Sequence, residues 1–253
     1  MRNPKSILIT GGSSGIGEAL ALEYAAPGVR LALTGRSSDR LDTVAESCRA
    51  KGAEVSTSIA DVRDATALRA WIEAEDDKAP LDLVIANAGV SRAGLEDLDY
   101  EARLRSVLAT NIEGVVNTVQ PALDRMRARK RGQVAIMSSI ASFIGMPGAV
   151  AYSTSKAAIR IYGEGLRGAV RGDGVEVSVI CPGYIRSHLT AKNTFSMPFL
   201  MNADRAARII RRGLARNAPR IAFPFPMYFL VWLMATLPVF VSDRLLRLSS
   251  GNA

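Results

Sequence analysis

Short apolar, β-branched runs alternate with longer amphipathic stretches along the whole 253-residue chain, and this alternation limits its fold more than any other feature. Strands bounded on both sides by helices pair in parallel, because each helix carries the chain back across the sheet. Apolar strands of this kind are covered on both faces. The sequence therefore predicts an α/β fold with a doubly wound parallel sheet of about seven strands. The predicted strands are residues 6–10, 29–34, 54–59, 81–86, 132–138, 175–181 and 220–223.

The same pattern predicts one domain. The chain has no linker-like stretch, internal repeat or low-complexity run, and its length suffices for one well-filled core. We therefore expect residues 1–253 to form a single domain. The main predicted helices are residues 16–26, 65–75, 109–129, 151–171 and 203–216.

The N-terminus, the cysteines and the histidine indicate where the protein works. Residues 1–5 lead directly into the first strand, so we expect no secretion signal. Cys48 and Cys181 are too few and too far apart to indicate disulfides or a metal site. His188, the only histidine, is interpreted as a loop residue. We expect a cytoplasmic protein without a metal, peripheral at the inner face of a membrane if it contacts one.

The formal net charge of +8 allows several anionic partners. A basic chain can bind nucleic acid, an anionic membrane surface or a phosphate-rich ligand. Its arginines are scattered, however, and only 6% of its residues are aromatic, so it lacks the interleaved basic and aromatic surface that nucleic acid needs. We expect no nucleic-acid partner.

A glycine-rich turn follows the first predicted strand and leads into a helix. Glycine allows a tight turn, and it lets a phosphate approach the backbone amides at the positive end of the helix. A strand, such a turn and a helix together indicate a dinucleotide site, with a ligand-free turn as the alternative. The residues expected to contact the cofactor are Thr10, Gly11, Ser13, Ser14, Gly15, Ile16 and Gly17.

The end of the second predicted strand indicates which dinucleotide binds. An acidic residue there would bond the ribose 2′-hydroxyl of NAD. Gly35 and Arg36 occupy this region instead, and an arginine can bind a 2′-phosphate with two hydrogen bonds. The sequence therefore favours NADP over NAD, with Arg36 as a merely solvated residue as the alternative. After the third strand, Asp61 and Val62 are candidates for contacting the adenine, unless Asp61 only forms a turn.

Tyr152 and Lys156 lie four residues apart on a predicted helix and are therefore neighbours on one face. An ammonium stabilises a nearby phenolate, and lowering a tyrosine pKa from about 10 toward about 7 takes roughly 4 kcal/mol. Such a tyrosine can act as a general acid or base near neutral pH. The spacing alone is weak evidence, because a solvated helix face often carries such a pair.

Further motifs accompany this pair in a fixed order, and together they resemble the short-chain dehydrogenase/reductase family in its single-domain form. The resemblance covers roughly residues 5 to 190. It implies a Rossmann-type fold with helices on both faces of the sheet, a nicotinamide dinucleotide and hydride transfer. The motifs that carry it are Thr10-Gly11-x-x-x-Gly15-x-Gly17, Asp61, Asn87-Ala88-Gly89, Asn111, Ser139, Tyr152-x-x-x-Lys156 and Pro182-Gly183.

The resemblance implies a catalytic role for four residues. Tyr152 would protonate the carbonyl oxygen in reduction, and Lys156 would lower the tyrosine pKa and bind the nicotinamide ribose. Ser139 would hold the substrate oxygen, and its spacing to Tyr152 favours it over the adjacent Ser138. Asn111 would anchor a water that links Lys156 to solvent, or it would only tie the helix backbone.

The resemblance also extends the cofactor site to two further turns. A small residue at Ala88 would let the cofactor lie close, although this turn is equally suited to stabilising the sheet. Ile185 would abut the nicotinamide carboxamide, and Ser187 would bond it where relatives usually have threonine. The additional cofactor contacts expected are Asn87, Ala88, Gly89, Tyr152, Lys156, Pro182, Gly183, Ile185 and Ser187.

The resemblance tells little beyond about residue 189, where the substrate is chosen. Residues 189–202 are rich in phenylalanine and methionine. They are expected to form a flap over a lipophilic substrate, with ordinary core as the alternative.

Residues 221–241 contain no charge, but three prolines interrupt them. The helix expected near 227–237 is too short to cross a bilayer. We expect the apolar C-terminal segment 224–248 to form a helical extension that contacts a membrane surface from one side or forms a buried dimer or lid element; a spanning segment is the least favoured reading.

These observations favour an NADP(H)-dependent oxidoreductase acting on a carbonyl or secondary alcohol of a hydrophobic substrate, such as a 3-oxoacyl, ketosphingoid, retinoid or steroid-like ketone. A broad-specificity carbonyl reductase is the second hypothesis. A non-catalytic dinucleotide-sensing protein is the third, although it would not need a poised phenol. By resemblance, the long helices around Asn111 and Tyr152 are expected to form a homodimer or homotetramer.

Overall fold

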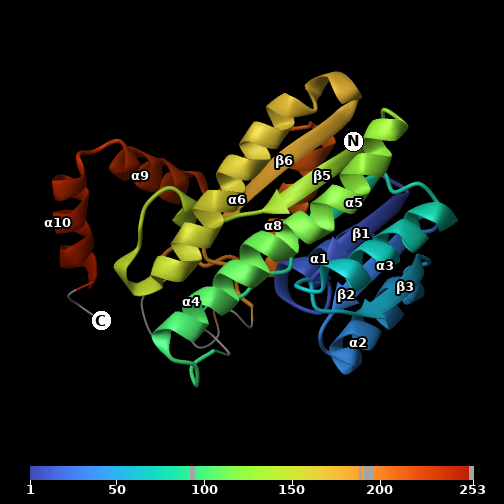
Figure 1. Cartoon of the computed structure of the whole chain (residues 1–253), viewed down its shortest axis with the longest axis horizontal. Helices are drawn as coiled ribbons and strands as arrows, with labels where there is room; N and C mark the ends of the chain where they lie inside the picture. Colours follow the sequence, from blue (N-terminus) through green and yellow to red (C-terminus); the bar gives the residue numbers. More distant parts are fainter. Residues whose placement is uncertain (92–94, 188–189, 191–196, 251–253) are drawn as a thin grey trace.

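The computed structural model describes residues 1–91, 95–187, 190 and 197–250. The strands of this part of the chain form one parallel sheet in the order β3-β2-β1-β4-β5-β6-β7 (Figure 1). Because β1 and β4 lie side by side at the centre, the chain winds outward in both directions from them. The strands are β1 (Ser6–Thr10), β2 (Arg30–Gly35), β3 (Glu54–Ile59), β4 (Leu83–Ala86), β5 (Gly132–Met137), β6 (Val175–Pro182) and β7 (Arg220–Phe223).

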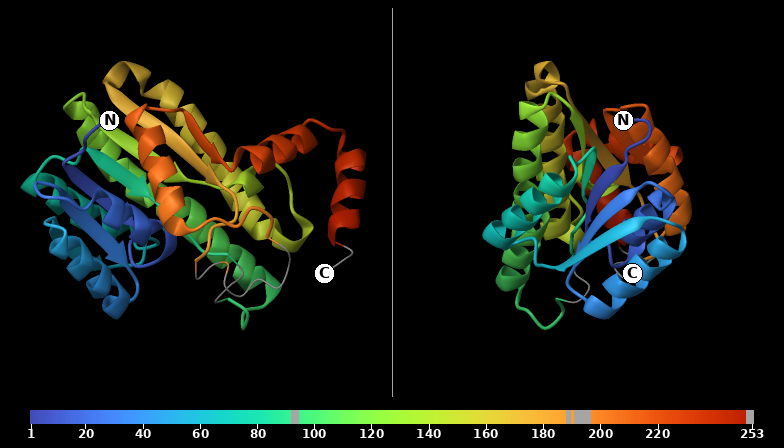
Figure 2. Two further views of the ribbon diagram at one scale, coloured as in Figure 1. Left: turned by 180° about the vertical axis from the view of Figure 1, so that it is seen from behind. Right: turned by 90° about the vertical axis from the view of Figure 1, so that its right-hand side faces the viewer.

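Helices cover both faces of the sheet (Figure 2). One apolar core lies between the sheet and α1, α2 and α8, and the other lies between the sheet and α3, α5 and α6. The α/β fold class is thus confirmed. The helices are α1 (Gly15–Tyr24), α2 (Ser38–Ala50), α3 (Ala65–Lys78), α4 (Tyr100–Leu108), α5 (Gly114–Ala128), α6 (Val150–Ala169), α8 (Ala203–Ala215), α9 (Phe225–Ala235) and α10 (Val239–Ser250).

The predicted strands are all present, with ends that differ by no more than two residues. The helix predicted over 109–129 is wrong at its start. Helix α4 begins nine residues earlier, where Asp99 caps it by accepting a hydrogen bond from the Ala102 amide, and a π-helical segment (Ala109–Glu113) joins α4 to α5. Strand β3 contains several polar side chains and is partly exposed, unlike the apolar covered strands expected, because it lies at the edge of the sheet.

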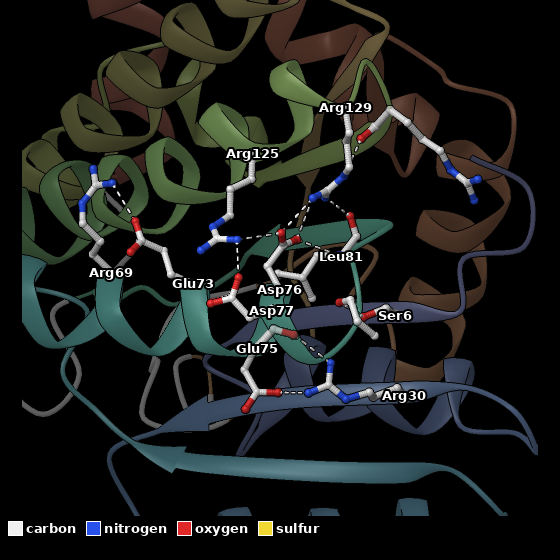
Figure 3. Close-up of polar contacts among 12 residues, drawn as sticks. Ser6, Arg30, Arg69, Glu73, Glu75, Asp76, Asp77, Leu81, Arg125 and Arg129 are labelled. Carbon is white, nitrogen blue, oxygen red and sulfur yellow. Dashed lines mark hydrogen bonds and ion pairs between the residues drawn. The ribbon is translucent and has the colours of Figure 1, made fainter.

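Buried ion pairs tie α3 to the sheet and to α5 at the end opposite the glycine turn (Figure 3). Arg30 donates to the Glu75 carbonyl oxygen at 3.0 Å and pairs with the Glu75 carboxylate. Asp76 accepts two hydrogen bonds from Arg129 Nη1, at 2.8 and 2.9 Å. Each buried carboxylate therefore has the partner that offsets its lost hydration, and these contacts hold the fold rather than the site.

The last two helices stand away from the rest of the molecule (Figures 1 and 2). Helix α9 begins two residues earlier than predicted because proline is tolerated in a first turn, where Pro226 lies. None of the residues of α9 is buried. Among the described residues, no helix combines the length and apolar character that crossing a membrane requires.

Candidate active site

The glycine turn between β1 and α1 is packed so closely that larger residues do not fit. Gly11 and Gly15 have φ angles of +67° and +59°, a region that favours glycine. A Cβ at Gly17 would lie 2.1 Å from the carbonyl oxygen of Gly11. Ser14 begins α1 without a side-chain capping bond, so the first amides of the helix are available to an anionic group. The turn therefore fits the phosphates of a dinucleotide.

Thr10 and Asn87 tie the carboxyl ends of β1 and β4 together. Thr10 Oγ1 accepts hydrogen bonds from the amides of Asn87 and Ala88, both at 3.2 Å. Asn87 Nδ2 donates to the carbonyl oxygens of Thr10 and Gly11, at 2.9 and 3.1 Å. These two side chains thus shape the turn from within, and we infer that they act on a ligand through that shape.

The ends of β2 and β3 form a more open side of the site. Arg36 follows β2 directly, and its side chain is exposed. Asp61 accepts hydrogen bonds from Arg63 Nε at 3.0 Å and Nη2 at 2.6 Å. These bonds hold the pKa of Asp61 below its ordinary value, and the charge of Arg36 adds to the effect. Arg63 was not predicted as a site residue, although an arginine two residues after an aspartate can form an ion pair with it.

Two other predicted cofactor residues of this side are buried in packing. The side chain of Val62 lies against Gly114, where a Cβ would be only 2.4 Å from Val62 Cγ2. The Val62 carbonyl oxygen accepts a hydrogen bond from Asn117 Nδ2 at 2.9 Å. Ser13 packs against Gly35, since a Cβ there would lie 2.8 Å from Ser13 Oγ. Both residues therefore fix the position of their turns.

Helix α6 places Tyr152 and Lys156 on one face, as their spacing predicts. The Lys156 ammonium lies 5.7 Å from the centroid of the Tyr152 ring. Lys156 Nζ also donates a hydrogen bond to the carbonyl oxygen of Met137, at the end of β5, at 2.9 Å. Lys156 is only 3% exposed, whereas Tyr152 is half-buried. The lysine is thus anchored in the core, and the tyrosine lies at the edge of the core on the same helix face.

The pKa values in this pair differ from the expectation. Burial raises the pKa of Tyr152 above its ordinary value, and the nearby Ser139 hydroxyl opposes the rise only in part. Burial also lowers the pKa of Lys156 from 10.5 to about 8. In this arrangement the net shift of the Tyr152 pKa is upward, because burial penalises the charged phenolate, and the expected lowering of this pKa by Lys156 stays a prediction.

The two adjacent serines after β5 have different partners. Ser138 Oγ donates to a backbone carbonyl of α6 at 2.8 Å and is fully engaged in packing. Ser139 Oγ donates to the Pro182 carbonyl oxygen at 3.4 Å and accepts from the Ala141 amide at 3.1 Å, so it caps a short 3-10 turn, and the same hydroxyl lowers the pKa of Tyr152. Of the two, Ser139 is the serine that faces the phenol.

Asn111 is fully buried in the π-helical segment Ala109–Glu113. Its Oδ1 accepts from the Val90 amide at 2.8 Å. Its Nδ2 donates to the Val90 carbonyl oxygen and to Ser155 Oγ, both at 2.9 Å. The side chain therefore joins the turn after β4 to α6. Val90 and Ser155 were not predicted as site residues, because nothing in the sequence around either one indicates a contact with Asn111. The predicted water relay stays a prediction.

Gly89 lies where these elements meet. A Cβ at this position would be 3.1 Å from Asn111 Oδ1 and 3.3 Å from Lys156 Nζ. Only glycine allows Asn111 Oδ1 and Lys156 Nζ to keep their present positions. The turn after β4, the π-helical segment and α6 thus converge at the amino group of the lysine.

The segment after β6 runs from the substrate side of the site to the glycine turn. Gly183 adjoins α9, since a Cβ there would lie 3.0 Å from Met227 Sδ. Ile185 is buried and forms an isolated parallel bridge with Met201. Ser187 approaches Gly15, where a Cβ would be 3.0 Å from Ser187 Cβ. A pocket of about 330 Å³ lies between the glycine turn and this segment, lined by Ser14, Gly15, Glu18, Ala19, Leu22, Arg186, Ser187, Ala203 and Asp204.

Much of the predicted flap 189–202 lies outside the described residues, namely 189 and 191–196, as does His188. The described Thr190 donates to the Ile185 carbonyl oxygen at 2.7 Å. Met201 is 8% exposed and belongs to the core, which is the alternative to a flap that the sequence left open. The remaining flap prediction is not tested by these contacts. In the described part of the chain, no group of three or more His, Cys, Asp or Glu side chains is placed to hold a metal.

Two sequence comparisons identify relatives of the whole fold. Residues 5–197 match the protein family described as short chain dehydrogenase. An oxidoreductase of Myxococcus xanthus, described as uncharacterized, is 39% identical over 236 residues, which are 92% of this chain and 93% of that protein. The 11-beta-hydroxysteroid dehydrogenase 1A of Arabidopsis thaliana is 40% identical over 198 residues, which are 76% of this chain but only 55% of that protein.

Solved structures show the same fold at lower identity. A short-chain dehydrogenase/reductase from Burkholderia phymatum in complex with NAD aligns with a TM-score of 0.82 at 23% identity, over 92% of this chain and 93% of that chain. A short-chain dehydrogenase from Sphingobium yanoikuyae in complex with NADPH aligns with a TM-score of 0.78 at 24% identity, over 87% and 88%.

Proposed function

The chain belongs to the short-chain dehydrogenase/reductase family of NAD(P)-dependent oxidoreductases, and on that premise we propose that it uses NADPH to reduce the carbonyl group of a hydrophobic substrate. One observation carries the proposal. Ser139, Tyr152 and Lys156 meet at the carboxyl end of β5, which is where ligands bind in a doubly wound sheet. The glycine turn that fits a dinucleotide lies at the same edge of the sheet.

The proposed roles follow from the contacts of each residue. When bound, the nicotinamide would supply the hydride. Ser139 and Tyr152 would hold the carbonyl oxygen by hydrogen bonds and stabilise the negative charge that develops on it. Tyr152 would then donate its proton to that oxygen, and its raised pKa keeps the phenol protonated at neutral pH. Lys156, whose pKa is about 8, is charged at neutral pH and would stabilise the phenolate.

We propose that Asn111 acts on this proton transfer from a distance. It holds the turn after β4 against α6 and so fixes the space around Lys156 Nζ. A water bound in this space would return a proton to Tyr152 through the lysine. This role is that of a positioning residue, since Asn111 touches neither the phenol nor the substrate oxygen.

Arg36 supports the choice of NADP over NAD. It is exposed directly after β2, beside the glycine turn. The end of β2 has no acidic residue that could bond the ribose 2′-hydroxyl of NAD, since Gly35 and Arg36 lie there. Its charge reaches Asp61 across the open side of the site. A guanidinium in this position can bind a 2′-phosphate with two hydrogen bonds.

The substrate end of the site supports a hydrophobic substrate. Gly183 is bordered there by the thioether of Met227 and the side chain of Ile140. Methionine adapts its shape to apolar ligands. The Arabidopsis relatives named 11-beta-hydroxysteroid dehydrogenase suggest a steroid-like ketone among the candidates, beside 3-oxoacyl, ketosphingoid and retinoid ketones.

A panel of ketones graded by chain length and ring size tests the proposal, with consumption of NADPH as the measurement. We expect kcat/KM to rise with the apolar area of the substrate, because each buried CH₂ contributes about 0.8 kcal/mol. Equal kcat/KM across the panel would support a broad-specificity carbonyl reductase instead. Tight NADPH binding without turnover of any ketone would support the dinucleotide sensor.

We also propose that two or four copies of the chain associate through α4 and α6. These helices pack together, and they expose Tyr100 (65%) and Ile161 (58%) on their outer surfaces. Apolar side chains so placed are suited to an interface between copies. Light scattering measures the mass in solution, and an Ile161→Glu variant is expected to lower it; a monomeric parent chain would contradict the proposal.

A further inference from the structure

Helices α9 and α10 expose large apolar side chains that none of the described residues covers. Phe225 is 68% exposed in α9, and Phe240 is 78% exposed in α10. The pair projects from the body, with α10 turned across the end of α9 (Figures 1 and 2). Monomeric soluble proteins rarely expose apolar patches of this kind without a partner. Among the side chains that the structure describes, the exposed large apolar residues of the pair are Phe225, Phe229, Leu230, Trp232, Leu233, Val239, Phe240 and Leu245.

The outer side of α9 lacks the polar residues that a surface helix normally presents to water. Its five exposed large side chains span roughly 160° of the circumference at about 100° per residue. No charged residue occurs between positions 221 and 242. A protein interface usually has a polar rim, whereas this side of α9 is apolar, and its Trp232 and phenylalanines are residues typical of a lipid interface.

The charge around this segment favours an anionic surface over a second copy of the chain. Helix α10 contains Arg244 and Arg247 against one acidic residue, Asp243, and no other charge occurs between positions 221 and 247. Two copies that met through α10 would each bring the same positive excess. An anionic leaflet attracts this excess instead.

We propose that α9 and α10 insert their exposed apolar side chains into one leaflet of an anionic lipid bilayer. The eleven residues of α9 extend roughly 17 Å at about 1.5 Å per residue, well short of the bilayer core of about 30 Å. The pair therefore enters the surface of the bilayer without crossing it, and the folded domain stays in water.

The base of α9 is fixed to the substrate side of the active site. The Tyr228 ring packs edge-on against Phe143, with centroids 5.4 Å apart. Arg220 pairs with Glu164 of α6 and donates to the Tyr228 hydroxyl at 3.2 Å. Bilayer docking would thus place the entrance for substrate near the lipid surface. This link rests on the proposed function, and it assigns the substrate to ketones dissolved in lipid.

Co-sedimentation tests the docking surface directly. The full-length protein is mixed with vesicles of phosphatidylcholine, with or without phosphatidylglycerol, at low and high salt. We expect binding to the vesicles that contain phosphatidylglycerol, and weaker binding at high salt. The variant Phe229→Ser/Trp232→Ser/Phe240→Ser is expected to lose at least tenfold in affinity. A control, Ile59→Ser/Leu98→Ser, removes exposed apolar residues elsewhere and should bind like the parent.

Tryptophan fluorescence gives a second, local measurement. The chain has two tryptophans, so a Trp71→Phe variant leaves Trp232 as the sole reporter. Its emission is expected to move to shorter wavelength when anionic vesicles are added, because the indole leaves water for the apolar interface. An unchanged emission spectrum would overturn insertion of α9.

The docking proposal would also be overturned if the parent did not bind vesicles, or if the triple serine variant bound them as well as the parent. If the parent bound no vesicles and formed a dimer that the triple variant separates, α9 and α10 would be an interface between two copies instead. Reduction of a water-miscible ketone without vesicles is measured in parallel. A triple variant that keeps this activity but loses vesicle binding supports the docking surface. A parent that binds vesicles but reduces no ketone also supports it, while overturning the reductase.

Discussion

The proposed site has a catalytic end, around the carboxyl end of β5, and an adenosine end, at the carboxyl ends of β2 and β3. The two ends differ in how many hydrogen bonds hold their side chains in place. At the catalytic end, Asn111, Ser139 and Lys156 are all buried, and each makes a hydrogen bond to another element. At the adenosine end, Arg36 is exposed, and Asp61 is half-buried with hydrogen bonds to Arg63, only two positions away.

This difference separates two kinds of functional residue. A buried residue with several partners affects folding, pKa values and catalysis together, because removing it leaves other polar groups unpaired. An exposed residue can change one binding energy and leave the fold as it is. Variants of the catalytic end should therefore change activity and stability together, whereas variants of the adenosine end should change cofactor affinity alone.

The largest effect is expected for Tyr152→Phe, which removes the proton donor at the catalytic end. We expect kcat to fall about 10³-fold, within the usual contribution of general acid catalysis. NADPH binding should be nearly unchanged. Initial rates of NADPH oxidation measure the effect, and Tyr162→Phe on the same helix, which loses one hydrogen bond with Gln120, is the matched control. Full turnover by Tyr152→Phe would refute the catalytic role.

Next in size is a pH effect of Lys156 on stability. The folded-state pKa of about 8 lies below 10.5, so the unfolded chain binds more protons between these pH values. Stability should therefore rise with pH in this window, as the buried ammonium is neutralised. At about 1.36 kcal/mol per pH unit, the gain relative to Lys156→Met approaches 3 kcal/mol.

Chemical denaturation of both proteins from pH 7 to pH 10.5 measures this difference. Other titrating groups cancel in the comparison because both chains contain them. Parallel curves for the two proteins would show that Lys156 is hydrated, and the contrast between the two ends of the site would then be much smaller.

Asn111→Ala should lower the free energy of unfolding by about 2 kcal/mol, because the amide of Val90 and the hydroxyl of Ser155 lose buried partners. It should also shift the pH profile of kcat, if Asn111 positions the proton relay. Asn202→Ala is the matched control, since this exposed residue begins α8 without a side-chain capping bond. Equal stability of the two variants would contradict the tie to α6.

The smallest effect is expected at the adenosine end. Arg36→Ala should raise the Kd of NADPH about tenfold through loss of a charge-assisted contact, and leave the Kd of NADH and the stability nearly unchanged. Titration of both cofactors measures this, and Arg40→Ala, an exposed arginine on α2, is the control. Tighter binding of NADH than of NADPH by the parent chain would exclude the role given to Arg36.

Local patterns made most of the fold predictable. Strand and helix positions follow from hydrophobic periodicity, which depends on neighbouring residues, whereas the order of the strands in the sheet comes from the structure. The start of α4 was missed because the Asp99 cap lies before the periodic stretch, and the π-helical segment at Asn111 has no periodicity of its own. The glycine turn was predictable in position, but only the structure gave the 2.1 Å contact that requires Gly17.

The sequence by itself determined the family, the fold class and the spacing that puts Tyr152 beside Lys156 on one helix face. The tertiary structure decided the direction in which the two pKa values shift, because desolvation depends on every element packed around the pair. It also decided that α9 and α10 face outward. The sequence shows that this segment is apolar, but whether its side chains are buried depends on which other parts of the chain pack against it in the fold.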